Sequence, residues 1–134
     1  MKIAEHTPGP WRWEISLCSK RLHLVGGETR FDLTVMDFVR WGMSGASMRL
    51  REDIDGRNLL YRCEKWAKPV AGREHHSEWF QQIDHPDARL IESAPDLLAA
   101  LENIMASVEA VAPGIKWTAE YEDARAAVKK ARGI

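Results

Sequence analysis

The side chains that could hold a metal ion gather in one stretch of the sequence. Glu74, His75 and His76 are consecutive, and Asp84 and His85 follow a short distance on. Imidazole and carboxylate groups are the ligands that zinc and similar ions use in proteins. The spacing matches no ligand motif, however, and adjacent residues on a helix point in different directions. We therefore predict no metal and no cofactor, with His75, His76 and His85 as the weak candidates for a metal-dependent enzyme.

Nucleophilic catalysis has little support in the sequence. It holds no G-x-S-x-G motif, no P-loop and no dinucleotide-binding glycine motif. Cys18 and Cys63 lie far apart and neither stands beside a histidine, so both thiols are expected to be inert. A non-enzymatic protein is therefore the favoured prediction, with a site assembled from distant residues as the alternative.

Two tryptophans stand close to cationic side chains and outside the expected core. Trp41 follows Arg40 in a glycine-containing loop, and Trp79 comes after Arg73 and His75. A ring and a cation together suit recognition of a protein surface or a nucleotide base. We predict that this part of the chain binds a partner, through a set that also includes two arginines of the charged stretch after the loop: Arg40, Trp41, Arg49, Arg51, Arg73, His75 and Trp79.

The same region is rich in basic residues. Between Arg49 and Arg73 the basic side chains are interleaved with Tyr61 and Trp66, and acidic residues dilute them. The formal net charge of the chain is −1, which argues against a dedicated nucleic-acid binder. A solvated charged face is the favoured interpretation, and nucleic-acid contact through the arginines is the weaker alternative.

A helical stretch from Asp84 to Val111 is the element around which the other segments must be placed. Apolar residues recur there at i, i+3, i+4 and i+7, which predicts a buried stripe on a helix. Asp84 or His85 can cap its start, and the Ala-Pro-Gly sequence at 112–114 is expected to end it. Pro95 lacks an amide hydrogen and would clash with an earlier carbonyl, so we expect a break or kink there and two helices in series.

Strands are expected at the start of the chain. Residues 11–17 alternate apolar and polar side chains, which predicts a half-buried strand, and residues 22–25 are expected to return as a hairpin. Residues 31–38 are also predicted as a strand, although their spacing suits a helix as well. The side chains expected on the buried face of the first strand are Trp11, Trp13, Ile15 and Leu17.

The remaining segments are predicted to be mainly helical. The charged residues 49–57 are expected to be mobile. Leu59, Cys63 and Trp66 fall at i, i+4 and i+7, which predicts a helix that begins near Asn58 and ends at Pro69. A short helix is expected around residues 79–83.

The chain is expected to end in a further helix. Thr118 is its predicted N-cap and Gly133 its predicted end. The residues expected on its buried stripe are Trp117, Tyr121, Ala124, Val128 and Ala131.

Strands first and helices later is the α+β pattern. We predict a small N-terminal antiparallel sheet, a hairpin plus one or two strands, packed on C-terminal helices. Residues 1–134 suit a single domain, with strands mainly over 1–40 and helices mainly over 58–132. The sequence shows no targeting segment or membrane span, and its two distant cysteines fit a reducing compartment, so we expect a cytoplasmic protein without a membrane partner.

Two segments resemble a widespread group of small phage and prophage proteins. HTPGPW at His6–Trp11 is similar to the TPGPW-like turn with which members of that group open, and DARLIESAPDLLAALE at Asp87–Glu102 is similar to their closing segment, NARLIAAAPDLLEALE. The chain also resembles, more distantly, the Ead-type early proteins of lambdoid phages. The resemblance supplies no catalytic residues, and neither motif covers the middle of the chain.

What the resemblance implies is a phage or prophage accessory protein that works in the cytoplasm of the host bacterial cell. We expect it to bind and inhibit or sequester a host factor, in an anti-defence role that is either anti-CRISPR-like or directed at a nucleotide signal. The expected partner is accordingly a host protein or a small nucleotide ligand, and self-association into a homo-oligomer is a further expectation.

Overall fold

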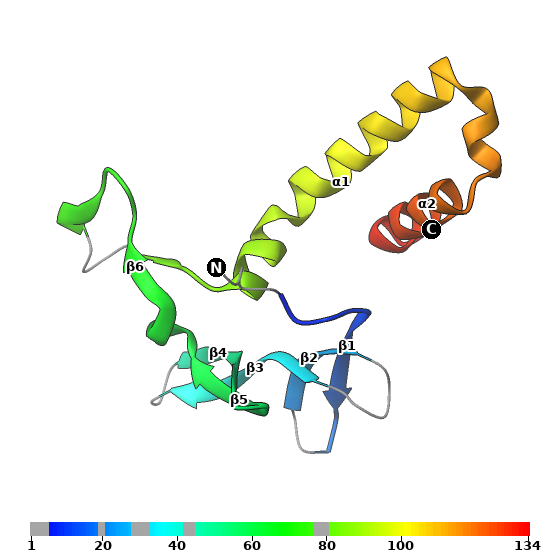
Figure 1. Ribbon diagram of the computed structural model, residues 1–134. Coiled ribbons are helices and arrows are strands. Elements are labelled where there is room, and N and C mark those ends of the chain that lie inside the picture. The colour runs from blue at the N-terminus through cyan, green and yellow to red at the C-terminus, as the bar shows by residue number, and fades with distance from the viewer. Residues whose placement is uncertain (1–5, 19–20, 28–32, 42–44, 77–80) are drawn as a thin grey trace. The chain divides into compact units, whose positions relative to one another are not determined.

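The computed structural model describes residues 6–18, 21–27, 33–41, 45–76 and 81–134 (Figure 1). The chain divides into two compact units, Met1–Leu90 and Ile91–Ile134. Two compact units can belong to one cooperative domain, so the single domain over 1–134 stays a prediction.

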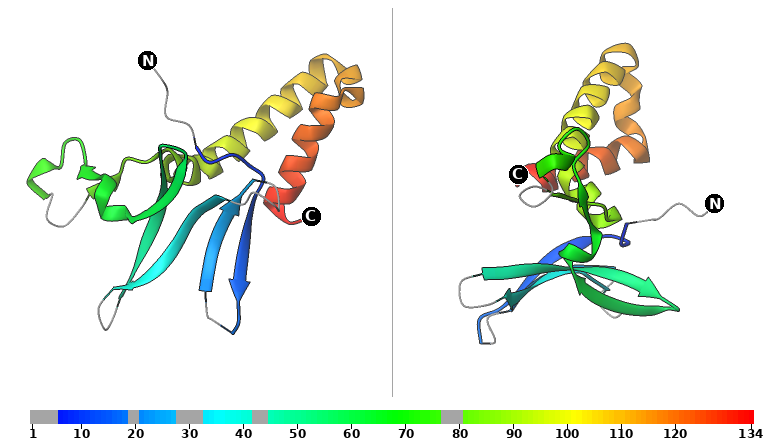
Figure 2. Two further views of the ribbon diagram at one scale, coloured as in Figure 1. Left: turned by 60° about the horizontal axis from the view of Figure 1, so that its bottom comes forward. Right: turned by 90° about the vertical axis from the view of Figure 1, so that its left-hand side faces the viewer.

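The first unit is built on an antiparallel sheet whose strand order follows the chain, β1-β2-β3-β4-β5. Figure 2 shows these strands side by side in one curved layer. The predicted hairpin of the first two strands is confirmed, as is the strand predicted to follow it. The strands of this sheet are β1 (Trp11–Ser16), β2 (Arg21–Gly26), β3 (Leu33–Trp41), β4 (Gly45–Ile54) and β5 (Arg57–Arg62).

Shorter elements connect this sheet to two long helices, and the predicted α+β class is confirmed. The short elements are the 3₁₀ turns η1 (Cys63–Trp66), η2 (Glu74–His76) and η3 (Pro113–Trp117), and the paired strands β6 (Ala67–Pro69) and β7 (Gln81–Ile83). The helices are α1 (Pro86–Val111) and α2 (Ala119–Arg132).

The core of the first unit lies on the central strands. Leu24, Met36 and Leu50 are register neighbours on β2, β3 and β4, and with Val35 they form the buried apolar cluster. Their burial follows from cross-strand pairing, which brings side chains on adjacent strands into contact on one face of a sheet. Partly buried residues that pack against this cluster are Trp11, Met48, Cys63, Trp66, Ile83 and Ala88.

The prediction that the whole apolar face of the first strand is buried is wrong. Trp11 packs on the core, but Trp13, Ile15 and Leu17 are exposed. The reason is position, since β1 is an edge strand of the sheet and only its first residue reaches the cluster. Trp117 was likewise expected on a buried stripe and is exposed.

The middle of the chain differs most from the expectation. The stretch predicted to be mobile is the end of β4 and its turn, in which Asp55 and Gly56 have φ of 53° and 76°. Two successive positive φ values are typical of the tight hairpin turn that an Asp-Gly pair favours. The turn reverses the chain, so the residues after it form β5, which pairs with β4, and η1 follows β5. The helix predicted over Asn58–Pro69 is therefore wrong.

The short helix predicted around residues 79–83 is wrong for residues 81–83, which form a strand. Ile83 lies in β7 and pairs with Ala67 of β6. Trp79 and Phe80 lie outside the described residues.

Helix α1 runs from Pro86 to Val111 with Pro95 inside it, so two separate helices are not formed. An interior proline costs about 3 kcal/mol. It removes only one hydrogen bond from a helix of 26 residues, which otherwise consists largely of good helix formers. The predicted end after Val111 is confirmed.

A buried hydrogen-bond network joins the N-terminal turn to the start of α1. The Thr7 amide donates to Asp87 Oδ1 over 2.5 Å, and the Thr7 hydroxyl donates to Asp87 Oδ2 over 2.6 Å. Arg51 Nε, from β4, donates to the same hydroxyl over 3.0 Å. Thr7 and Asp87 are 0% and 1% exposed. Because a buried carboxylate is costly unless its oxygens are satisfied, these bonds fix two segments that are 80 residues apart.

His85 extends this network as the residue before α1. Its Nδ1 accepts from the Asp87 amide over 3.0 Å, so Nε2 bears the proton and donates to the Arg51 carbonyl over 2.7 Å. Its ring also packs edge-on against Trp66, with 4.6 Å between the ring centroids. The prediction that Asp84 or His85 caps this helix is confirmed for His85.

Gly26 is required where the N-terminal turn crosses β2. A Cβ at this buried position would lie 2.5 Å from the Pro8 carbonyl oxygen and 3.0 Å from both Thr7 Cγ2 and Trp11 Cδ1. The Trp11 indole also donates to the Thr7 carbonyl over 2.9 Å, which holds the turn in this position.

We expect Thr7→Val to lower the free energy of unfolding by about 3 kcal/mol, because it removes the partner of a buried carboxylate oxygen and of Arg51 Nε. Thr7→Ser keeps the hydroxyl and should cost only about 1 kcal/mol for the lost methyl group. Urea unfolding of the two variants measures the difference. Equal losses would contradict the role assigned to the hydroxyl.

We expect Gly26→Ala to destabilise the protein by about 2 kcal/mol, since its methyl group meets backbone rather than a movable side-chain end. Gly114→Ala is the matched control, because nothing lies within 4 Å of the Cβ it would add. The control should stay within about 0.5 kcal/mol of the parent in thermal or urea unfolding. If Gly26→Ala left the free energy of unfolding unchanged, the N-terminal turn would not lie in close contact with β2.

Candidate functional site

A hollow of about 320 Å³ lies on the five-stranded sheet, between β2, β3 and β4 and bordered by β5. It joins charged and apolar side chains, which is the usual make-up of a site that binds through a few oriented polar groups. The residues that line it are Leu22, His23, Thr34, Asp37, Phe38, Val39, Arg49 and Leu60.

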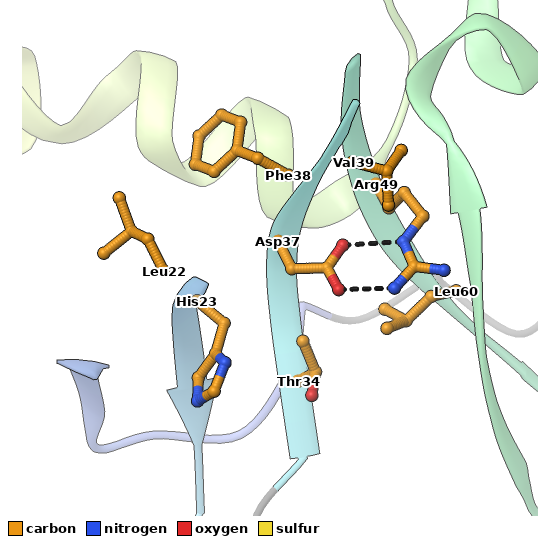
Figure 3. A pocket seen from close by; sticks show the side chains of 8 residues that line it. All are labelled: Leu22, His23, Thr34, Asp37, Phe38, Val39, Arg49 and Leu60. Carbon is orange, nitrogen blue, oxygen red and sulfur yellow. Dashed lines mark hydrogen bonds and ion pairs between the residues drawn. The ribbon is translucent and has the colours of Figure 1, made fainter. Parts of the chain in front are cut away.

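The centre of the hollow is an ion pair between β3 and β4. Arg49 Nε donates to Asp37 Oδ1 over 2.8 Å, and a terminal guanidinium nitrogen donates to Oδ2 over 2.6 Å. Figure 3 shows the two groups facing each other, with Phe38 and Leu22 extending away from the pair. The hydrogen bond to Asp37 raises the pKa of Arg49 above its ordinary value. The arginine side chain is 33% exposed and the aspartate 17%, so the pair is partly open to solvent.

This pair belongs to a row of polar residues that crosses the sheet. Glu14, His23, Asp37, Arg49 and Arg62 are successive register partners on the five strands. Register partners share one face of a sheet, so the row has acidic residues on β1 and β3 and basic residues on β4 and β5. His23 Nε2 lies 3.2 Å from Glu14 Oε1.

A β-bulge sets this alignment. The register of β2 against β3 shifts by one residue between Leu24 and Val25. Without the shift, the pairing of Gly26 with Leu33 would continue in step and place His23 opposite Met36. The bulge therefore brings His23 opposite Asp37 and keeps Met36 among the apolar residues of the core.

The predicted partner-binding residues are not brought together. Arg49 lies in the hollow, whereas the Arg51 side chain donates a hydrogen bond to Thr7 in the buried network. Arg40 and Trp41 end β3, opposite Ala46 and Gly45.

Arg73 and His75 belong to the segment between β6 and β7 and not to the five-stranded sheet. Arg73 precedes η2, and His75 lies in η2 with its ring centroid 3.9 Å from that of His76. Trp79 is outside the described residues.

The weak metal candidates do not form a ligand set. Both ring nitrogens of His85 are engaged in the network at the start of α1. Within the described ranges, no three His, Cys, Asp or Glu side chains stand close enough to hold a metal ion together. Several basic side chains of the middle region are paired with acids, among them Arg49 with Asp37, Lys65 with Glu52 and Lys68 with Asp84.

Comparison with protein families matches residues 1–134 to the family described as Salmonella phage P22 protein Y8K6. The chain belongs to that family. No curated protein and no solved structure shows significant similarity to it. The expectation of a phage protein is thereby confirmed, whereas membership of the group that the two motifs define and the more distant resemblance to Ead-type proteins stay predictions. In the part of this Y8K6-family chain that the structure describes, no helix is both long and apolar enough to cross a bilayer.

The structure also gives a physical role to the two motifs that first pointed to phage proteins. Thr7 of the HTPGPW turn and Asp87 of the DARLIESAPDLLAALE segment bond to each other in the buried network. In this member of the Y8K6 family the motifs therefore hold the fold together, and the hollow lies in the stretch between them.

We expect a double-mutant cycle of Asp37→Ala and Arg49→Ala to give a coupling energy of about 1 kcal/mol, because a bidentate but half-open pair is screened by solvent. The exposed pair of Glu122 and Arg125 on α2 is the comparison and should couple by about 0.3 kcal/mol. Urea unfolding of the four variants of each cycle supplies the values. A coupling near zero for the first pair would show that it does not form in solution.

Proposed function

We propose that this Y8K6-family protein is a phage accessory protein that acts by binding a host protein, and that the hollow around Asp37 and Arg49 is its contact site. The proposal is supported by one observation above all. A partly exposed charge pair lies beside the half-buried apolar side chains of Val39 and Leu60, on a sheet whose position is fixed by a separate buried network. A rigid platform of this kind lowers the entropy cost of association.

The chemistry of the pair favours a protein over a nucleotide. Arg49 uses two of its five N–H groups on Asp37, which leaves donors for a carboxylate or a backbone carbonyl of a partner. Among the described residues that line the hollow, Arg49 is the one arginine or lysine, and a phosphate would have to compete with Asp37 for it. A protein surface can instead pair with both charges and place an apolar side chain against Val39, which lies two residues from Asp37 on the same face of the sheet.

The host proteins that a phage-encoded binder opposes are those that limit phage growth. We therefore propose a component of the host's defences as the partner and inhibition or sequestration as the effect. The alternative is sequestration of a nucleotide signal, and calorimetry with a cyclic nucleotide distinguishes it from binding of a host protein.

We expect a photo-crosslinking residue that replaces Val39 to form a covalent adduct with a host protein inside the bacterium, because Val39 lines the hollow on the face of Asp37. The same residue in place of Ile54 is the control, because Ile54 is exposed on the same sheet but does not line the hollow. Arg49→Glu should abolish the adduct at position 39. Equal adducts at both positions, or an adduct that survives Arg49→Glu, would overturn the proposed site.

With the purified partner, calorimetry should show that Arg49→Glu weakens binding at least tenfold, or about 1.4 kcal/mol. Arg57→Glu makes the same charge change at an exposed position on β5 and should leave affinity unchanged within about twofold. Binding of a cyclic nucleotide that depends on Arg49, without any protein adduct, would overturn the protein partner in favour of a nucleotide signal.

A further inference from the structure

Seven apolar residues of α1 follow a seven-residue repeat. Their spacing alternates four and three residues, which is the a and d pattern of a coiled coil, while Ile91, Leu98 and Met105 fall at the adjoining position on the side that faces α2 at Met105. The repeat extends for three heptads along Leu90, Ala94, Leu97, Leu101, Ile104, Val108 and Val111, and we call this set the seam.

The second helix of the hairpin packs on a different face of α1. Tyr121 Oη donates to Glu109 over 2.6 Å, and Arg132 forms two hydrogen bonds to Glu102. The hydrogen bond to Glu109 raises the pKa of Tyr121. A groove between the two helices is lined by Glu102, Met105, Ala106, Glu109, Tyr121 and Val128. At 3.6 residues per turn, the α1 residues of this groove lie roughly 130° around the helix from the seam.

The seam is open over most of its length. Leu97 is 53% exposed, Ile104 60%, Val108 37% and Val111 86%. Large apolar side chains exposed in a continuous line mark an interaction surface, whereas single ones do not. The seven-residue period favours a helix as the partner, because residues at this spacing are those with which two helices pack in a coiled coil.

The neighbours of the seam suit a second copy of the same helix. The flank of the seam on the side away from α2 consists of Ser93, Ala100 and Ser107, which are again seven residues apart. These side chains are small and uncharged, so two helix backbones can approach closely and no like charges meet. A partner of another sequence is normally selected by charges at these flanking positions, and α1 has none there. A seam about 30 Å long, covered on both copies, removes on the order of 1,000 Å² from solvent, which reaches the lower range of specific interfaces.

We propose that the protein forms a two-fold homodimer in which the α1 seams of two copies pack as a coiled coil. An isologous pair of this kind uses the same surface on both copies and leaves the groove between α1 and α2 unchanged. The residues that line the hollow on the sheet all belong to the first compact unit.

Sedimentation equilibrium of the full chain should give twice the 15.3 kDa chain mass, with dissociation on dilution. Ile104→Glu places a charge at the centre of the seam and should raise the dissociation constant by on the order of 30-fold or more. Asn103→Glu is the matched control, since this exposed neighbour lies off the seam and should leave the dimer intact.

Leu97→Glu is a second seam variant, and circular dichroism checks that each variant keeps its helix content. If Ile104→Glu fails to fold, Leu97→Glu decides by the same mass measurement. A wild-type monomer up to millimolar concentration would overturn the proposal, as would a dimer that survives both seam variants or an assembly larger than a dimer.

Discussion

The pairing of Thr7 with Asp87 is the constraint on which the first unit depends. It satisfies both oxygens of a buried carboxylate with one residue's amide and hydroxyl, and Arg51 and His85 complete the set from β4 and the start of α1. Removing any one partner leaves a buried polar group unsatisfied, so the network forms as a whole or not at all. The N-terminal turn, the fourth strand and the helix start are therefore fixed by one cooperative interaction.

This arrangement separates the residues that hold the fold from those that are open to a partner. Arg49 and Arg51 are two residues apart on β4, yet one pairs with Asp37 in the hollow and the other bonds to Thr7 in the buried network. Both were predicted from the sequence as partner-binding arginines. Because an arginine in a charged stretch looks the same whether its bonds are internal or external, only the tertiary contacts distinguish the two roles.

Elements with local signals could be predicted, and those that depend on register could not. The first hairpin, the cap at His85 and the caps of α2 at Thr118 and Gly133 each have a signal within a few residues, and all are present. The helix expected after residue 58 failed because the tight turn at Asp55 outweighed a helical spacing. The hollow was not predictable, since its charges come from three strands and face each other only after a bulge shifts the register.

Helix α1 shows how one amphipathic pattern can cover two different sides of a helix. Its apolar residues predicted a single buried stripe, but the hairpin buries only the side that holds Met105, while the line through Leu97 and Ile104 stays exposed. Counting apolar residues cannot separate these two sides, because both satisfy i, i+3 and i+4 spacing. The period cannot separate them either, since Leu98 and Met105 are seven residues apart, as are Leu97 and Ile104. Only the position of α2, which meets one side at Met105, distinguishes them, and that position depends on contacts that the sequence of α1 alone does not contain.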